Sequence, residues 1–351
     1  MAVSSKDNIV FLNNLKQEIA PDKFNLISPY GYGDIMALCG FKEAIEDFYK
    51  AKVNFIIKQQ HEIVMKLFNI SDYSIKAFTE DELEQIADKN PTMQIGKYFV
   101  AHPYFLDDNH KLLNSFADLK IDFIKLFQKT IALPDYSVWK EPKNTPYITP
   151  SLEQKLSKIA PLEKIILFSP EAFSTKKINR RVLELEVERL FEKGFTVISS
   201  VLDKKEAIKG TVYLDLSMEE SLAIGINCAG VYAVRSGFVD LILNYIDKMT
   251  VFYPDTETYS LYSLKKIPGK NIEEIIATGS QVDKIGPFFQ IETKSNQKMY
   301  RFCFTALRVK EKREYIKYSM LGIPVWLIRK EPNSRKHYLF ACICVYKEGN
   351  K

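Results

Sequence analysis

Short apolar runs alternate with longer segments of helical periodicity along most of the chain. A short strand-like segment at residues 23–29, KFNLISP, is followed by apolar residues every three or four positions up to residue 48, and an apolar run at 53–57 is followed in the same way. Short apolar runs bounded by turn residues are typical of buried strands, and the three- to four-residue spacing is typical of helices. Strands that alternate with helices predict a parallel sheet covered on both faces.

A proline-rich segment divides this pattern. Residues 134–150 contain four prolines and show no helical period. Proline fixes its own φ and disfavours the helical conformation of the residue before it, so this segment is predicted to be an inter-domain linker. The alternation then resumes, with apolar runs such as 164–168 and 231–234. We therefore predict an α/β protein with one Rossmann-like domain over 1–133 and a second over 151–290.

The last part of the chain follows a different pattern. Phe302, Leu321 and Phe340 follow one another at intervals of 19 residues, and each belongs to a strand-like apolar run that ends in a charged turn. Residues 301–336 contain ten Lys or Arg and three Glu, a local charge of +7 in a chain whose net charge is +5. Repeats of this kind predict a small β-meander with basic turns. The sequence thus predicts a β-rich C-terminal appendage over 291–351.

The composition sets limits on the class of protein. With 46% hydrophobic and 26% charged residues it is typical of a soluble globular protein, and the modest net charge gives no reason to expect a nucleic-acid partner. No apolar run approaches the roughly 18 residues of a membrane-spanning helix, and the N-terminus lacks the pattern of a secretory signal. The cysteines lie in apolar segments without C-x-x-C spacing: Cys39, Cys228, Cys303, Cys342 and Cys344. We expect free thiols and a cytoplasmic location.

The first candidate for chemistry is the segment 230–245, GVYAVRSGFVDLILNY. A strand that breaks at Arg235, Ser236 and Gly237 into a helix leaves N–H groups unpaired at the helix start, and these, with the helix dipole, can hold a phosphate. Arg235 adds a guanidinium group that can bind phosphate through two hydrogen bonds. The alternative is an ordinary strand-to-helix turn in which Arg235 forms a surface ion pair.

The second candidate is YGYGD, residues 30–34, at the end of the first apolar run. Gly31 and Gly33 allow the backbone on either side of Tyr32 to turn tightly and to approach a ligand closely. Asp34 stands at a predicted helix start. With the ordinary carboxyl pKa near 3.9 it would be ionised at neutral pH and able to accept a proton. The alternative is that Asp34 only caps the helix.

Three further residues follow predicted strands. Lys176 lies in a loop ahead of a helix, where it is either solvated or in reach of a diphosphate. Tyr253 ends a strand, where its ring is expected to flank a nucleobase, and His102 ends a strand of the first half beside the expected cleft. The other histidines, His61 among them, fall in no catalytic pairing. No Asp-x-Asp motif follows a strand in the second half, so we expect no metal site.

Four motifs together resemble those of glycosyltransferase family 9 and its relatives, the heptosyltransferase-like group of bacterial GT-B sugar transferases. SPYGYGD, SPEAFSTKKI, DLSMEESLAIGINCAGVYAVRSGFVDLI and TVFYP are similar to that family's motifs in kind, order and spacing, over residues 23–255. The resemblance implies a GT-B fold, two Rossmann-like domains facing a cleft, with the nucleotide-sugar donor held by the C-terminal domain. It also implies sugar transfer with inversion and without an obligatory metal. The nucleotide sugar is then a substrate, and no cofactor is expected.

The resemblance assigns roles to individual positions. Asp34 matches the carboxylate expected to act as the base, and Lys176 matches a lysine that contacts the donor phosphates. Ser236 and Gly237 match the Ser-Gly whose helix start holds the diphosphate. Arg235 is a departure, since heptosyltransferases usually have an Asp there that contacts the heptose, so both a hexose and a heptose stay open as the donor sugar.

These expectations combine into one predicted function with alternatives. The main prediction is an inverting hexosyl- or heptosyltransferase that builds a bacterial surface glycan, such as lipopolysaccharide or capsule, on a lipid-linked or oligosaccharide acceptor. A sugar-nucleotide epimerase or hydrolase of the same fold, and a non-catalytic binding module, are the alternatives. For the basic tail we expect peripheral contact with the inner face of the cell membrane. Its alternative is packing on the body of the protein or on a second subunit of a homo-oligomer.

Overall fold

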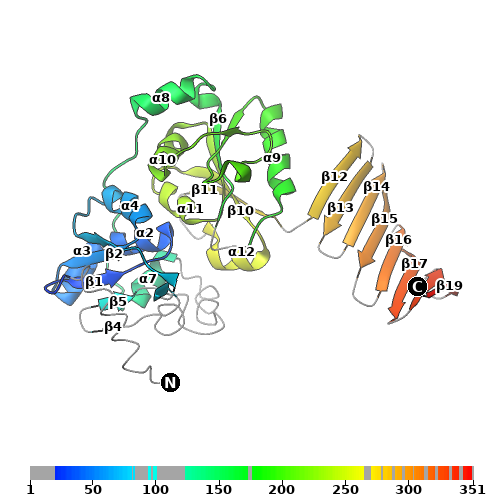
Figure 1. Ribbon diagram of the computed structural model, residues 1–351, viewed down its shortest axis with the longest axis horizontal. Coiled ribbons are helices and arrows are strands. Elements are labelled where there is room, and N and C mark those ends of the chain that lie inside the picture. The colour runs from blue at the N-terminus through cyan, green and yellow to red at the C-terminus, as the bar shows by residue number, and fades with distance from the viewer. Residues whose placement is uncertain are drawn as a thin grey trace.

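The computed structural model of the chain contains three β-sheets among the residues that it describes (Figure 1). It describes residues 20–80, 82–83, 123–172, 176–264 and 270–277 in full. Of residues 94–95 and 98–100, and of the strands between 280 and 349, it describes the backbone. The first two sheets lie close together, and the third extends to one side of the second (Figure 1).

The first sheet has the strand order β3-β2-β1-β5-β4. Its strands are β1 (Phe24–Ile27), β2 (Val53–Ile57), β3 (Tyr73–Ile75), β4 (Gln94–Ile95) and β5 (Tyr98–Val100). All pairs are parallel except β4 with β5. The connections are α2 (Tyr32–Gly40), α3 (Lys42–Tyr49), the 3₁₀ turn η1 (Gln59–His61) and α4 (Glu62–Leu67), with α7 (Phe123–Thr130) later in the chain. Every residue of β1 and β2 is buried, as expected for parallel strands covered on both faces.

The predicted linker forms neither helix nor strand before Pro150, but it is not a free tether. The indole N–H of Trp139 donates to the carbonyl of Ala37 in α2 at 3.1 Å, and Lys140 N donates to the carbonyl of Gly40 at 2.9 Å. A Cβ built on Gly40 would lie 2.0 Å from the indole nitrogen of Trp139. The absence of a side chain at Gly40 therefore lets the extended segment pack against the end of α2.

The second sheet is parallel throughout, in the order β11-β10-β9-β6-β7-β8. Its strands are β6 (Ile165–Ser169), β7 (Thr196–Ser199), β8 (Val212–Tyr213), β9 (Gly230–Val234), β10 (Lys248–Tyr253) and β11 (Asn271–Ile276). The helical elements are α8 (Pro150–Ser157), η3 (Leu162–Lys164), α9 (Arg180–Glu192), η4 (Lys204–Glu206), α10 (Met218–Asn227), α11 (Gly237–Ile242) and α12 (Thr256–Tyr262). The chain runs outward from β6 to β8 and then returns to β9 beside β6. Ligands of such sheets bind beyond the carboxyl ends of the strands near this reversal.

Both thiols that the structure describes are free, as predicted: Cys39 is buried and Cys228 is half-buried. Among the described residues, no helix combines the length and apolarity needed to cross a membrane.

The third sheet is an antiparallel meander of eight strands in sequence order. The strands are β12 (Ser280–Gly286), β13 (Phe289–Lys294), β14 (Gln297–Phe302), β15 (Phe304–Glu311), β16 (Tyr315–Met320), β17 (Ile323–Glu331), β18 (Ser334–Leu339) and β19 (Ile343–Gly349). The sequence predicted a small meander from residue 291 onward. The sheet in the structure starts earlier, at Ser280, because β12 and β13 pair with each other and β13 pairs with β14.

Candidate functional site

The first turns of α2 and α11 touch each other, and this contact joins the units built on the first two sheets. A Cβ built on Gly237 would lie 3.0 Å from Cβ of Tyr32 and 3.1 Å from the backbone nitrogen of Gly33. A Cβ built on Gly33 would lie 2.3 Å from Oδ2 of Asp240 in α11. Two glycines facing each other thus allow the close approach. The two motifs that the sequence analysis placed far apart in the chain, YGYGD and Arg-Ser-Gly, meet here.

Asp34 lies in the first turn of α2, where its carboxylate accepts a hydrogen bond from the Gly31 N–H at 2.9 Å. The capping role considered as an alternative is therefore real. Burial raises the pKa of Asp34 to about 7, with Asp240 contributing in the same direction, while the Gly31 N–H and Arg235 oppose the shift. The expectation of an ordinary carboxyl that is fully ionised at neutral pH is thus wrong. A carboxyl that titrates near neutrality is well matched to proton transfer at that pH.

Arg235 is buried, and protein acceptors occupy its guanidinium group. Its two terminal nitrogens bind the Asp240 carboxylate at 2.9 and 2.7 Å, and its Nε donates to the Tyr262 carbonyl at 3.1 Å. The guanidinium also lies 5.8 Å from the centre of the Tyr262 ring. The ion pair considered as an alternative exists, but it is buried rather than on the surface. A phosphate at this position would have to compete with Asp240.

Ser236 is the N-cap residue of α11, yet its hydroxyl forms no capping hydrogen bond. Its Oγ is buried and has no hydrogen-bond partner. The N–H groups at the start of α11 are therefore not satisfied by this side chain. Gly237 lies against Tyr32 and Gly33 of the first unit, and both Ser236 and Gly237 are half-buried.

Lys176 lies in the connection between β6 and α9, and its side chain contacts the start of α12. Its ammonium binds Asp255 at 2.8 Å and Glu257 at 3.1 Å, and its side chain is 68% exposed. The pair with Lys176 lowers the pKa of Asp255 to about 2. Lys176 is thus accessible and near the carboxyl ends of the strands, as predicted, and two carboxylates hold it.

One predicted residue, Tyr253, does not lie where its expected role requires. The Tyr253 ring is fully buried, packs edge-to-face on Tyr259, and donates its hydroxyl hydrogen bond to Glu274. It fills the space under α12, so it offers no open face to a nucleobase, and the expectation is corrected in this respect. His102 lies outside the described residues.

Buried polar side chains without partners lie after three of the strands, and of these the sequence analysis missed Ser28 and gave His61 no role. Within the described part of the chain, side chains whose buried polar atoms lack a hydrogen-bond partner include Ser28 after β1, His61 after β2 and Ser236 after β9. Both ring nitrogens of His61 are without partners, and its ring packs edge-to-face on Tyr32 at 4.9 Å. Burial lowers the pKa of His61 to about 4, so the imidazole is neutral. Buried polar groups without partners are rare and often mark a place where a ligand or water binds.

Asp240 was also missed, although the sequence carries a signal for it. Asp240 follows Arg235 by five residues and lies in the first turn of α11, where a carboxylate is favoured by the helix dipole. Burial raises the pKa of Asp240, and Arg235 opposes the shift.

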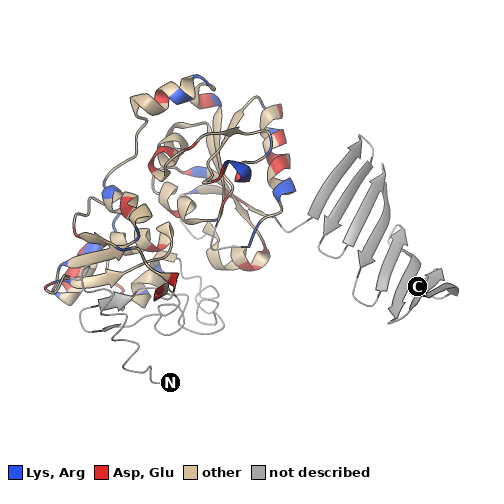
Figure 2. Cartoon of the chain, viewed as in Figure 1, with Lys and Arg blue, Asp and Glu red and all other residues tan. Residues whose placement is uncertain are grey.

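The described charged side chains are interleaved rather than gathered by sign. Figure 2 shows both signs along α9, which carries Arg and Glu on the same helix of the second unit. Arg181 pairs with Glu184 and Glu188, and Arg189 with Glu186. Among the described residues there is also no group of three or more His, Cys, Asp or Glu side chains placed to hold a metal ion.

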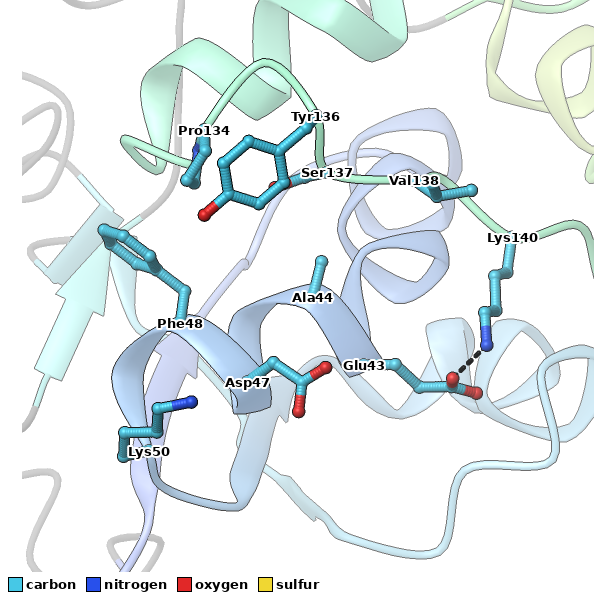
Figure 3. A pocket seen from close by; sticks show the side chains of 10 residues that line it. All are labelled: Glu43, Ala44, Asp47, Phe48, Lys50, Pro134, Tyr136, Ser137, Val138 and Lys140. Carbon is cyan, nitrogen blue, oxygen red and sulfur yellow. Dashed lines mark hydrogen bonds and ion pairs between the residues drawn. The ribbon is translucent and has the colours of Figure 1, made fainter.

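A hollow of about 490 Å³ lies elsewhere, between α3 and residues 134–140 (Figure 3). The rings of Phe48 and Tyr136 lie at one end of it, and Lys140 pairs with Glu43 at the other. Its lining residues are Glu43, Ala44, Asp47, Phe48, Lys50, Pro134, Tyr136, Ser137, Val138 and Lys140. None of these is a predicted site residue, so this hollow and the contact of α2 with α11 are separate features.

No family model matches the chain, and no curated protein matches its sequence. Similar solved structures include the Escherichia coli ADP-heptose lipopolysaccharide heptosyltransferase II, with a TM-score of 0.47 and 11% identity over 75% of this chain and 91% of that one. A glycosyltransferase of family 9 from Veillonella parvula has a TM-score of 0.49 and 11% identity over 75% and 89%. The iron-containing dodecameric glycosyltransferase TibC of enterotoxigenic Escherichia coli has a TM-score of 0.43 and 13% identity over 66% and 58%.

Proposed function

We propose that this protein is an inverting glycosyltransferase that moves a sugar from a nucleotide-sugar donor to an acceptor of a bacterial surface glycan. The observation that supports this most directly is the position of Asp34. Its buried carboxyl, with a pKa of about 7, lies where the first turns of α2 and α11 touch. A base that titrates near neutral pH at the junction of two parallel-sheet units suits the deprotonation of an acceptor hydroxyl.

The proposed transfer is a single displacement. The acceptor hydroxyl oxygen attacks the anomeric carbon of the donor sugar while its proton passes to the Asp34 carboxylate. The bond between the anomeric carbon and the phosphate oxygen breaks, and its electron pair leaves with the nucleoside diphosphate. Attack opposite to the leaving group inverts the anomeric configuration. Positive groups near the leaving diphosphate stabilise the charge that develops on it.

On the donor side, Lys176 and Arg235 are the proposed cations, with Ser236 and Gly237 at the start of α11. Each cation is held by carboxylates in the structure: Lys176 by Asp255 and Glu257, and Arg235 by Asp240. A carboxylate presents oxygen acceptors of the same kind as a phosphate. Donor binding at Lys176 is therefore proposed as an exchange of carboxylate for phosphate oxygens, while Arg235 keeps its pair with Asp240 and adds positive charge near the leaving diphosphate. The nucleotide sugar is a substrate, and no metal enters the proposal.

On the acceptor side, the YGYGD loop and His102 are the proposed binding residues. Gly31, Tyr32 and Gly33 form the turn that holds Asp34, and the neighbouring Ser28 and His61 carry polar atoms without partners. A hydroxyl-rich acceptor, either an oligosaccharide or a lipid-linked sugar, offers both donors and acceptors to such groups. The proposed location of the reaction is the inner face of the cell membrane.

A two-step experiment tests the function. Thermal-shift measurements with ADP, UDP, GDP and CDP and with their common sugar conjugates identify the donor that raises the melting temperature. Release of the nucleoside diphosphate is then followed with and without oligosaccharides prepared from lipopolysaccharide and capsule. Acceptor-dependent release, with an inverted anomeric configuration by NMR, is the expected result. Release that does not depend on the acceptor would identify a hydrolase, conversion of the nucleotide sugar into an isomer without release would identify an epimerase, and binding without turnover would identify a binding module.

A further inference from the structure

Asp240 is a side chain of the second unit that reaches into the first. Its carboxylate, in α11, lies so close to Gly33 of α2 that a Cβ there would be 2.3 Å from Oδ2. Gly33 directly precedes Asp34 in the chain. Asp240 is therefore next to the proposed base, although 206 residues separate them in sequence.

Arg235 fixes the Asp240 carboxylate in this position. Two hydrogen bonds join the groups, at 2.9 and 2.7 Å, and the two side chains are only 6% and 10% exposed. The carbonyls of Ser236 and Tyr262 accept further hydrogen bonds from the same guanidinium. A planar guanidinium bound by a carboxylate in this paired manner has little freedom to turn.

We propose that Asp240, held by Arg235, is a positioning residue that makes Asp34 an effective proton acceptor only while α2 and α11 are in contact. This inference rests on the proposed role of Asp34 as the base. When the two helices touch, Asp34 loses solvent and gains a neighbouring carboxylate. When they separate, Asp34 returns to water and becomes an ordinary, weakly basic carboxylate. Proton acceptance is then coupled to the contact that also brings the two proposed substrate sites together.

Among the described residues, three charged or titratable groups face Asp34, and their charges decide in which direction each substitution should shift the pKa of Asp34. Tyr30, in the loop before α2, remains a neutral phenol because burial and Asp34 raise its pKa. Asp240 and Arg235, from the second unit, act in opposite directions on the pKa of Asp34. Like charges disfavour the ionised carboxylate and opposite charges favour it. Removing Asp240 and removing Arg235 should therefore shift the titration of Asp34 in opposite directions.

NMR of the full-length protein labelled with [4-¹³C]aspartate tests the inference without any substrate. The signal of Asp34 is identified by its loss in Asp34→Asn, and its midpoint is followed from pH 4 to pH 9. In the unaltered protein we expect a midpoint of about 7. In Asp240→Asn, which keeps the shape of the side chain, it should fall by about one pH unit or more, and in Arg235→Met it should rise.

Two further variants separate a positioning role from a merely structural one. Gly33→Ala places a methyl group against Asp240, so it should separate the helices and move the Asp34 midpoint toward the ordinary carboxyl value. Asp247→Asn removes an exposed carboxylate of the second unit that pairs with Lys270. It serves as the matched control and should leave the Asp34 midpoint unchanged.

The outcomes are distinct. An Asp34 midpoint that does not move in Asp240→Asn overturns the inference, even if Arg235→Met fails to fold. A fall of the Asp34 midpoint in both Asp240→Asn and Arg235→Met also overturns the inference, because a looser contact between α2 and α11 would by itself explain both falls. If the protein turns over no nucleotide sugar, the proposed function fails while the carboxyl titration still reports on Asp240. If turnover is present, the acid limb of its pH profile should move with the midpoint measured by NMR.

Discussion

Asp34 both caps α2 and carries the proposed chemistry, and one substitution separates these roles. Asparagine keeps the size of the side chain and a carbonyl oxygen that can accept the Gly31 N–H, so Asp34→Asn should retain the fold and donor binding. It cannot act as a base, so turnover should fall by about 10²- to 10⁴-fold. The measurement is turnover and thermal melting of the purified variant side by side with the unaltered protein. Near-normal turnover would remove Asp34 from the mechanism.

The pKa of Asp34 also predicts how stability depends on pH. Its folded-state pKa of about 7 lies above the ordinary value of 3.8, so between these values the folded state binds more protons than the unfolded state. The protonated carboxyl therefore contributes its full stability below pH 4, and this contribution is lost as the pH rises through 7. The loss is on the order of 4 kcal/mol. The asparagine of Asp34→Asn has no titrating carboxyl. From pH 5 to pH 8 the melting temperature of the unaltered protein should therefore fall relative to that of the variant. A constant difference would contradict the raised pKa.

His61 predicts a gain in stability on substitution. A buried polar group without a hydrogen-bond partner costs about 1–3 kcal/mol, and both imidazole nitrogens of His61 are in that state. Phenylalanine is similar in shape and keeps the edge-to-face contact with Tyr32. His61→Phe should therefore raise the free energy of unfolding, measured by denaturant titration, while weakening acceptor use if His61 binds the acceptor. A loss of stability in His61→Phe would show that the imidazole has a structural partner.

The candidate site could be predicted from sequence only where its signals are local. Asp34 and Gly237 each stand at a strand-to-helix turn, and such turns are readable from a few neighbouring residues. The pair of Arg235 with Asp240 is local as well, five residues apart at one strand-to-helix turn, but the closeness of Asp240 to Gly33 depends on how α11 meets α2 and is not readable from neighbouring residues. Tyr253 shows the same limit: its position at a strand end was predicted correctly, but the burial of its ring depends on α12, which the sequence analysis did not identify.

At the scale of elements, the loops after β6 and β9 carry the proposed donor-binding cations. Lys176→Ala and Arg235→Ala should each weaken nucleoside diphosphate binding by roughly 10- to 100-fold, from the loss of a charge-assisted hydrogen bond worth about 1.5–3 kcal/mol. Binding of the matching nucleoside should barely change. Calorimetry with both ligands makes the comparison, and equal losses for the two would assign these residues to the fold instead.

The structure adds a difference between these two variants. Arg235→Ala leaves the Asp240 carboxylate buried without its partner, which typically costs about 3–5 kcal/mol of stability. Lys176 lies on the surface, so Lys176→Ala should leave the melting temperature nearly unchanged. Lys176→Ala is therefore the cleaner test of donor binding. A large drop in its melting temperature would contradict the surface position.

The strands that could be predicted are those with continuous apolar runs, such as β2 and β6, and the best-marked helix start is that of α10. There the Ser-x-x-Glu spacing of Ser217 and Glu220 is typical of a capping box, and the structure shows it with hydrogen bonds of 3.1 and 2.8 Å. Strand β11 was missed because its sequence, NIEEII, places two glutamates in its middle. Those glutamates accept hydrogen bonds from neighbouring hydroxyls, including that of Thr250, so the strand lies in the sheet without a continuous apolar pattern.

At the scale of the whole molecule, the third sheet shows which basic residues of the tail lie opposite each other on neighbouring strands, and the sequence repeat alone does not predict this. Its register pairs Lys310 with Lys317 and places Lys336 between Arg329 and Lys347 on neighbouring strands. Like charges directly opposite each other destabilise a sheet, and an anionic surface would relieve this repulsion. Each basic residue near an anionic membrane contributes about 1 kcal/mol, so four that act together would contribute on the order of 4 kcal/mol.

We therefore expect the full-length protein to sediment with vesicles that contain phosphatidylglycerol, and to remain in solution with phosphatidylcholine vesicles. Salt should release it, because the attraction is screened within about 10 Å at 0.1 M ionic strength. Replacing Lys310, Lys317, Arg329 and Lys336 by Gln should abolish sedimentation. The matched control replaces four exposed lysines of the second unit, Lys193, Lys204, Lys205 and Lys209, and so reaches the same net charge with the sheet intact. If both variants sediment as well as the unaltered protein, the sheet does not bind the membrane, and light scattering would then show whether it joins two subunits.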